Sequence, residues 1–118
     1  MRLAKTSFPK ENRLRKSYEF LEIFKKGRSV REKNIALYFR KKTLNENRFG
    51  IVVSRKAMPR AVDRNRVKRV TREFFRLKRT SSSQEHDIVI RLIGPFKALE
   101  NKELRSILEI LFTKAGLV

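Results

Sequence analysis

The segment DRNRVKRVTREFFRLKR, residues 63–79, constrains the fold of this chain more than any other. At ~100° per residue it predicts an amphipathic helix over residues 64–79, with Asp63 as the N-cap at the positive end of the helix dipole. Four apolar side chains fall on one stripe of this helix: Val67, Val70, Phe74 and Leu77. We therefore expect the helix to pack with this stripe against the rest of the domain.

The opposite side of this helix carries a large excess of positive charge. Residues 64–79 contain a single acid, Glu73, and eight basic side chains: Arg64, Arg66, Lys68, Arg69, Arg72, Arg76, Lys78 and Arg79. Like charges four residues apart, such as Lys68 and Arg72, weaken a helix by ~0.2–0.5 kcal/mol per pair. A face that destabilises its own helix indicates an external anion, and arginine binds phosphate in bidentate geometry. The alternative is a solvated face without a partner.

The whole chain shows the same excess of positive charge. Its 118 residues include 31 Lys and Arg against 12 Asp and Glu, which gives a net charge of +19. So much charge on one small body is best explained by a polyanionic partner, and nucleic acid is the first candidate. An anionic membrane would require a basic helix with an apolar face open to lipid, and a generally basic solvated surface is the remaining explanation. We expect no membrane partner.

The composition also excludes several classes of protein. No run reaches 18 apolar residues, which argues against a transmembrane helix, and the N-terminus lacks the apolar stretch of a secretory signal. The chain has no cysteine, so disulfides, cysteine-type zinc sites and thiol nucleophiles are excluded. We expect a single cytoplasmic domain over residues 1–118.

The remaining segments alternate between helix and strand patterns. Residues 1–16 are basic and irregular and are expected to form an arm. A helix is predicted from Ser17 to Gly27, and a last helix from about Asn101 to Ala115, ended by Gly116. Strands are predicted over residues 34–41, 49–53 and 88–93, the first two paired as a hairpin around residues 45–47. The order α-β-β-α-β-α predicts an α+β fold with a sheet of at least three strands.

Four stretches of the sequence match the motifs of a known family in order and spacing. They are YEFLEIFKKGRS (18–29), FGIVVSRK (49–56), RNRVKRVTREFFR (64–76) and HDIVI (86–90). Over roughly residues 12–112 the chain resembles the bacterial ribonuclease P protein subunit. This resemblance implies a mixed sheet of three to four strands, a short extra strand or turn near Ala57–Met58, and a left-handed β-α-β crossover.

The resemblance also implies a function. In that family the enzyme is a ribonucleoprotein, in which a large RNA carries out the Mg²⁺-dependent hydrolysis that removes the 5′ leader from precursor tRNA. The small basic protein binds both the RNA and the leader. We therefore expect ribonuclease P RNA and precursor tRNA as partners, one protein per RNA, no DNA partner and no metal site in the protein alone.

Two groups of residues follow from the resemblance. The group expected to dock on the catalytic RNA is Arg64, Asn65, Arg66, Lys68, Arg69, Arg72 and Arg76. The group expected to line a cleft for the leader is Phe20, Phe24, Ser54, Arg55 and Lys56. Strand alternation, and not the resemblance, adds Tyr38 and Arg40, which we expect on the same exposed sheet face. Phenylalanines four residues apart on a helix can stack bases at ~1–3 kcal/mol each, although core packing is an equal alternative for Phe20 and Phe24.

One position departs from the family pattern. The basic pair that usually follows the third predicted strand is replaced by Ile93 and Gly94. Arg91 or Lys97 could replace the missing charge, and strand alternation places Arg91 with Val89 and Ile93, opposite Ile88, Ile90 and Leu92.

The polypeptide itself shows no catalytic constellation. Its single histidine, His86, lies between two acids and is expected to be a turn residue before a strand, with metal ligation as the alternative. The acids are scattered singly, and no glycine-rich phosphate loop is present. We expect the chain to be chemically inert without RNA. Two other classes compete: a structural ribosomal protein, and a DNA-binding regulator, which would require a short helix before residues 64–79.

Overall fold

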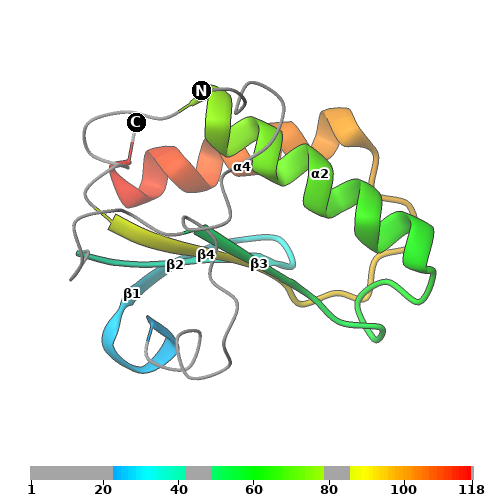
Figure 1. The fold of residues 1–118 in the computed structure, drawn as a ribbon, viewed down its shortest axis with the longest axis horizontal. Coiled ribbons are helices and arrows are strands. Elements are labelled where there is room, and N and C mark those ends of the chain that lie inside the picture. Colours follow the sequence, from blue (N-terminus) through cyan, green and yellow to red (C-terminus); the bar gives the residue numbers. More distant parts are fainter. Residues whose placement is uncertain (1–22, 42–48, 79–85, 118) are drawn as a thin grey trace, which may run out of the picture.

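The computed structural model describes residues 23–41, 49–78 and 86–117 (Figure 1). Residues 23–26 are helical. The further elements are β1 (Arg28–Glu32), β2 (Ile35–Lys41), β3 (Phe49–Val53), α2 (Ala61–Leu77), β4 (His86–Leu92) and α4 (Asn101–Ala115). The predicted α+β fold is confirmed. The arm over residues 1–16, Ser17 and Phe20 lie outside the described residues.

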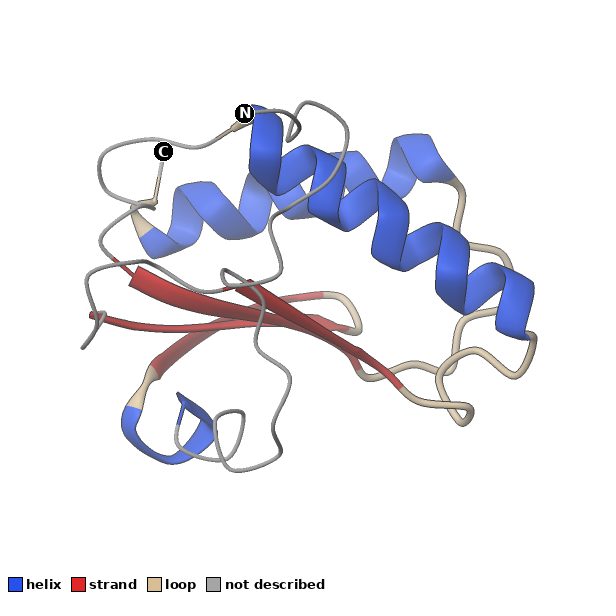
Figure 2. Ribbon diagram, viewed as in Figure 1, coloured by secondary structure: helices blue, strands red, loops and turns tan. Residues whose placement is uncertain are grey.

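The four strands form one mixed sheet in the order β1-β2-β4-β3. β2 pairs antiparallel with both β1 and β4, whereas β3 and β4 are parallel neighbours joined through α2. The sheet is covered on one face by α2 and α4, and the helical segment 23–26 lies on the opposite side (Figure 2). The left-handed sense of the β3-α2-β4 crossover stays a prediction.

The main core lies between the sheet and the two helices. Strand alternation directs one set of side chains toward the helices: Ile35, Leu37, Phe39, Phe49, Ile88, Ile90 and Leu92. At its centre the rings of Phe49 and Phe75 stack at 4.3 Å between centroids, and Phe74 meets Phe112 edge-on at 5.3 Å. This aromatic layer joins β3, α2 and α4 and fixes both helices on the same face.

The predicted hairpin between residues 34–41 and 49–53 is wrong, because β4 lies between these two strands. β2 is buried along most of its length and therefore needs a hydrogen-bonded neighbour on each side. These neighbours are β4 and β1. The fourth strand is thus Arg28–Glu32. Near Ala57–Met58 the chain forms a turn, one of the two alternatives that the resemblance implied, closed by a 3.0 Å hydrogen bond from Met58 N–H to Ser54 O.

The amphipathic helix α2 is confirmed, with two corrections. It begins at Ala61, and its N-cap is Arg60 with no side-chain cap, so Asp63 lies inside the first turn. Leu77 is 67% exposed, whereas Thr71 and Phe75 join Val67, Val70 and Phe74 in the buried set. The buried side of α2 is therefore rotated from the predicted stripe toward Phe75, which faces the sheet. Leu77, at the opposite edge of the predicted stripe, is left exposed.

The last helix has the predicted bounds. Leu104, Ile107, Leu108 and Leu111 are buried, and Gly116 ends the helix with a left-handed φ of 72°. The backbone N–H of Leu117 donates to Phe112 O at 2.9 Å, which satisfies a terminal carbonyl. β4 begins two residues earlier than predicted, so His86 is its first residue and not part of a turn, and its ring packs edge-on against Phe39.

We predict that Phe75→Ala lowers the free energy of unfolding by about 3–5 kcal/mol, because it removes a fully buried ring from the aromatic layer. Leu77→Ala on the same helix is the matched control and should change it by less than about 0.5 kcal/mol. Denaturant unfolding of both variants measures the difference. A loss at Leu77 as large as that at Phe75 would contradict this packing.

Candidate nucleic-acid interface

The face of the sheet opposite α2 and α4 is here called the second face. Its side chains are set by the strand register, because residues paired across neighbouring strands point to the same side. They are Ala36, Tyr38 and Arg40 of β2, Asp87, Val89 and Arg91 of β4, Gly50 and Val52 of β3, and Ser29 and Arg31 of β1. The predicted placement of Tyr38 and Arg40 on one face is confirmed by this register, as is that of Arg91 with Val89.

An aromatic pair occupies the middle of the second face. Phe24, from the helical segment 23–26, meets Tyr38 at 4.6 Å between ring centroids with an interplanar angle of 60°. Ile23 and Val89 are fully buried beneath them, whereas Phe24 and Tyr38 are only partly buried. The pair is therefore packed from below and retains accessible ring surface. Phe24 thus contributes to packing and also keeps ring surface on which a base could stack.

Gly27 allows this close approach of the segment to β2. Its N–H donates to Ile23 O at 2.8 Å and ends the helical turn. A Cβ at this position would lie 2.5 Å from Ile23 O and 2.8 Å from Phe39 O, both backbone atoms that cannot swing aside. Glycine is thus required by the close packing that sets Phe24 over Tyr38.

Arg91 extends the aromatic pair with a positive charge. Its guanidinium carbon lies 5.6 Å from the centroid of the Phe24 ring, within cation–π range. Arg91 is exposed and lies next to Val52 in the register. Ser54, Arg55 and Lys56 follow β3 directly and form an exposed turn at this same end of the sheet.

Arg40 lies at the other end of the second face. Its Nε atom is 3.7 Å from Asp87 Oδ2, and the Asp87 side chain is only 4% exposed. A buried carboxylate needs such a partner, because an isolated charge is costly to remove from water. Arg40 is therefore held at the edge of the face by an ion pair, unlike the exposed Arg91.

The predicted RNA-docking residues of α2 divide into two sets. Arg64 Nη1 donates to Met58 O at 2.9 Å and to Pro59 O at 2.8 Å, and Arg76 pairs with Glu73 at 2.9 Å. In contrast, Asn65 and Arg69 are exposed, and Lys68 and Arg69 form no ion pair within the part of the chain that the structure describes. Arg72 is half-buried.

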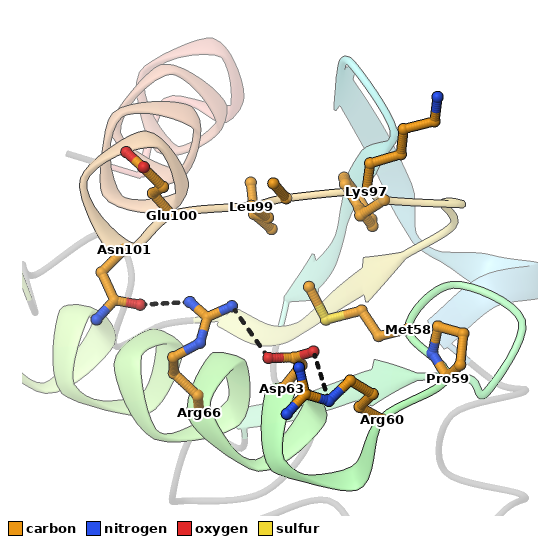
Figure 3. Close-up of a pocket in the computed structure, with 11 residues that line it drawn as sticks. Met58, Pro59, Arg60, Asp63, Arg66, Lys97, Leu99, Glu100 and Asn101 are labelled. Carbon is orange, nitrogen blue, oxygen red and sulfur yellow. Dashed lines mark hydrogen bonds and ion pairs between the residues drawn. The ribbon is translucent and has the colours of Figure 1, made fainter.

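Arg66 lies in a pocket between the two helix N-termini (Figure 3). It donates to Asn101 Oδ1 at 2.6 Å and lies 3.8 Å from Asp63 Oδ1, which in turn pairs with Arg60. The pocket has a volume of about 700 Å³. Lys97 lines this pocket, whereas Arg91, the other candidate for the missing charge, lies beside the aromatic pair.

The exposed face of α4 differs from that of α2. Three ion pairs connect it to its surroundings: Lys33–Glu103 at 3.8 Å, Lys78–Glu109 at 3.1 Å and Lys114–Glu32 at 2.9 Å. Signs are mixed here, as on an ordinary solvated helix. Three of the described acids thus form ion pairs with lysines on this side of the molecule.

Three further observations concern only the described residues. None of their helices is long and apolar enough to cross a membrane. They contain no group of three or more His, Cys, Asp or Glu side chains that could hold a metal ion. The strand and turn before α2 also lack the preceding short helix that a helix-turn-helix DNA-binding protein requires.

A small α+β domain with an aromatic and cationic sheet face and a basic helix has the features of the nucleic-acid-binding class of proteins. The model of the Ribonuclease P family matches residues 8–116. The chain is 42% identical over 112 residues to the ribonuclease P protein component of Desulfosudis oleivorans, with 93% of this chain and 90% of that one covered. It is 37% identical over 111 residues to that of Clostridium acetobutylicum, with 92% of each covered.

Solved structures agree with these sequence matches. The ribonuclease P protein of Staphylococcus aureus has a TM-score of 0.80 at 31% identity, covering 90% of this chain and 96% of that one. The ribonuclease P protein of Thermotoga maritima has a TM-score of 0.71 at 35% identity, covering 86% and 96%. The chain belongs to the ribonuclease P protein family, as the sequence motifs predicted, and it is the protein subunit of that enzyme. The ribosomal alternative is not supported.

We predict that Arg64→Ala lowers the free energy of unfolding by about 1–2 kcal/mol, because it leaves two carbonyls of the β3–α2 loop without their charged donor. The control is Arg69→Ala, which removes the same charge from an exposed site and should cost less than about 0.5 kcal/mol. Equal unfolding free energies for the two variants would show that Arg64 does not hold the loop.

Proposed function

We propose that this chain binds ribonuclease P RNA through the basic face of α2, and the 5′ leader of precursor tRNA across the second face. The observation that carries the proposal is the partly exposed Phe24–Tyr38 pair with the Arg91 guanidinium beside it. One protein would serve each RNA. We also infer that the protein acts in the cytoplasm.

The chemistry of the second face suits a single strand of RNA. Aromatic rings stack with any base, because every base has a π-face, and nearby cations follow the phosphate backbone. Arg55, Lys56 and Arg91 supply exposed positive charge at one end of the face. Such a site would bind leaders of differing sequence, and it would favour precursor over mature tRNA because only the precursor carries a leader.

The chemistry of α2 suits the phosphate backbone of a folded RNA. Asn65, Lys68 and Arg69 lie on its accessible side, and the like-charge repulsion along this helix is relieved when phosphates bind. Arg64 and Arg66, in contrast, fix the first turns of the helix against Met58, Pro59 and Asn101. In this proposal they position the helix, so that the neighbouring side chains meet the RNA in a fixed geometry.

Hydrolysis itself is assigned to the RNA subunit. Mg²⁺, held by phosphates of the RNA and the substrate, would activate water and neutralise developing charge. The protein contributes binding energy and orientation. Among its described acids, Asp87, Glu32, Glu103 and Glu109 are each paired with a basic side chain, which agrees with this division.

We predict that Phe24→Ala weakens binding of precursor tRNA to the reconstituted holoenzyme by about 1–3 kcal/mol, the usual value for one base–aromatic stack, and leaves mature tRNA binding unchanged. Phe24→Leu keeps an apolar side chain over Ile23 and Val89 but removes the ring, so it should show the same selective loss. Equal losses for precursor and mature tRNA would contradict leader binding at this face.

For α2, we predict that Lys68→Ala reduces the slope of log affinity for ribonuclease P RNA against log salt concentration by about one, because one phosphate contact is lost. Lys102→Ala, on the ion-paired side of the molecule, is the control and should leave the slope unchanged. Filter binding over a salt series measures both. An unchanged slope for Lys68→Ala would remove this residue from the RNA interface.

A further inference from the structure

Arg91 occupies an unusual position in the sheet. β4 is an inner strand, hydrogen-bonded on both sides, and Arg91 is the only exposed residue along it. Its neighbours in the register are Ala36 on β2 and Val52 on β3, which offer no counter-charge. A solvated charge on an inner strand adds nothing to the core.

The nearest acid on the same side of β4 as Arg91 is Asp87, which already forms an ion pair with another arginine. Strand alternation places Asp87 on the second face, and there it pairs with Arg40. Among the described residues, Arg91 forms no ion pair, and its side chain interacts with the Phe24 ring alone. The guanidinium therefore keeps its full charge and its donors for a phosphate group.

The position over Phe24 has a consequence for base stacking. A guanidinium and a nucleobase cannot occupy the same side of one ring, so a base that stacks there must displace Arg91. The cation–π contact of an exposed arginine is weak, whereas a charge-assisted bidentate bond to phosphate is strong. The exchange of one for the other is therefore favourable when the base and its phosphate arrive together.

We propose that Arg91 determines the preference for leader-bearing substrate by such an exchange: it covers the Phe24 ring in the free protein and moves to a leader phosphate when a base stacks on that ring. This inference rests on the proposed binding of the leader at the second face. It adds a phosphate-binding residue that also limits access to the aromatic site. An apolar ligand without a phosphate would have to displace Arg91 without compensation.

The test compares holoenzymes that contain wild-type protein, Arg91→Ala, Arg91→Lys and the matched control Arg105→Ala, which removes a guanidinium from an exposed site on α4. Precursor and mature tRNA are bound over a salt series. We expect Arg91→Ala to weaken precursor binding about tenfold at low salt and to reduce its salt slope by about 0.7, the contribution of one phosphate in a single strand. The Arg91→Ala and wild-type curves should converge or cross at high salt, because the uncovered ring then compensates for the lost contact.

The control and the lysine variant sharpen this comparison. Arg105→Ala should behave as wild type, and Arg91→Lys should keep the salt slope. An Arg91→Ala holoenzyme with wild-type affinity and slope for precursor tRNA would overturn the inference, and so would an equal loss for mature tRNA. If the wild-type holoenzyme itself shows no preference for the precursor, the proposed function fails, which is a separate outcome.

A second measurement locates the contact on the substrate. Leader phosphates are replaced one at a time by uncharged methylphosphonate linkages. One replacement should weaken binding to the wild-type holoenzyme and have no further effect on Arg91→Ala, because the same contact is already missing. Replacements that weaken both holoenzymes equally at every position would show that Arg91 contacts no leader phosphate.

Discussion

The position of β4 between β2 and β3 determines the rest of the structure. Because β4 is hydrogen-bonded on both sides, its alternating side chains divide the molecule into two faces. Ile88, Ile90 and Leu92 point to the core under α2 and α4, and Val89 and Arg91 point to the second face. A shift of β4 by one residue would exchange these sets and bury the arginine. The register of β4 with β2 and β3 thus determines both the core and the candidate leader site.

The distribution of charge follows from this architecture. Acidic side chains gather around α4 and β1, where they pair with Lys33, Lys78 and Lys114. Among the described residues, Arg91 of the second face and Lys68 and Arg69 of α2 form no ion pair, whereas Arg40 and Arg66 pair with Asp87 and Asp63. Exposed positive charge without a paired acid thus lies on both surfaces assigned to RNA, and a chain with a net charge of +19 bears a cost in self-repulsion when it is free.

Much of the fold could be predicted from the sequence, because α2, α4 and β2 have strong periodicity and clear ends. β1 could not, because Arg28–Glu32 is a polar edge strand and its turn uses Lys33 at a φ of 54°, without the usual glycine signal. The false hairpin followed from this, since sequence proximity favours pairing of consecutive strands. At the site, spacing identified the residues on one face. It could not show that Arg64 and Arg66 turn toward the chain itself, or that Arg91 lies over Phe24, because these contacts depend on side-chain rotamers and on elements distant in sequence.

The central claim is that the leader crosses the second face, and cross-linking tests it most directly. A photoreactive p-benzoylphenylalanine replaces Tyr38 in the reconstituted holoenzyme, and a second holoenzyme carries it in place of Ile110 on α4. The account predicts a cross-link from position 38 to leader nucleotides of precursor tRNA and none from position 110. A cross-link from position 38 to the body of tRNA or to ribonuclease P RNA, with the leader unlabelled, would contradict it.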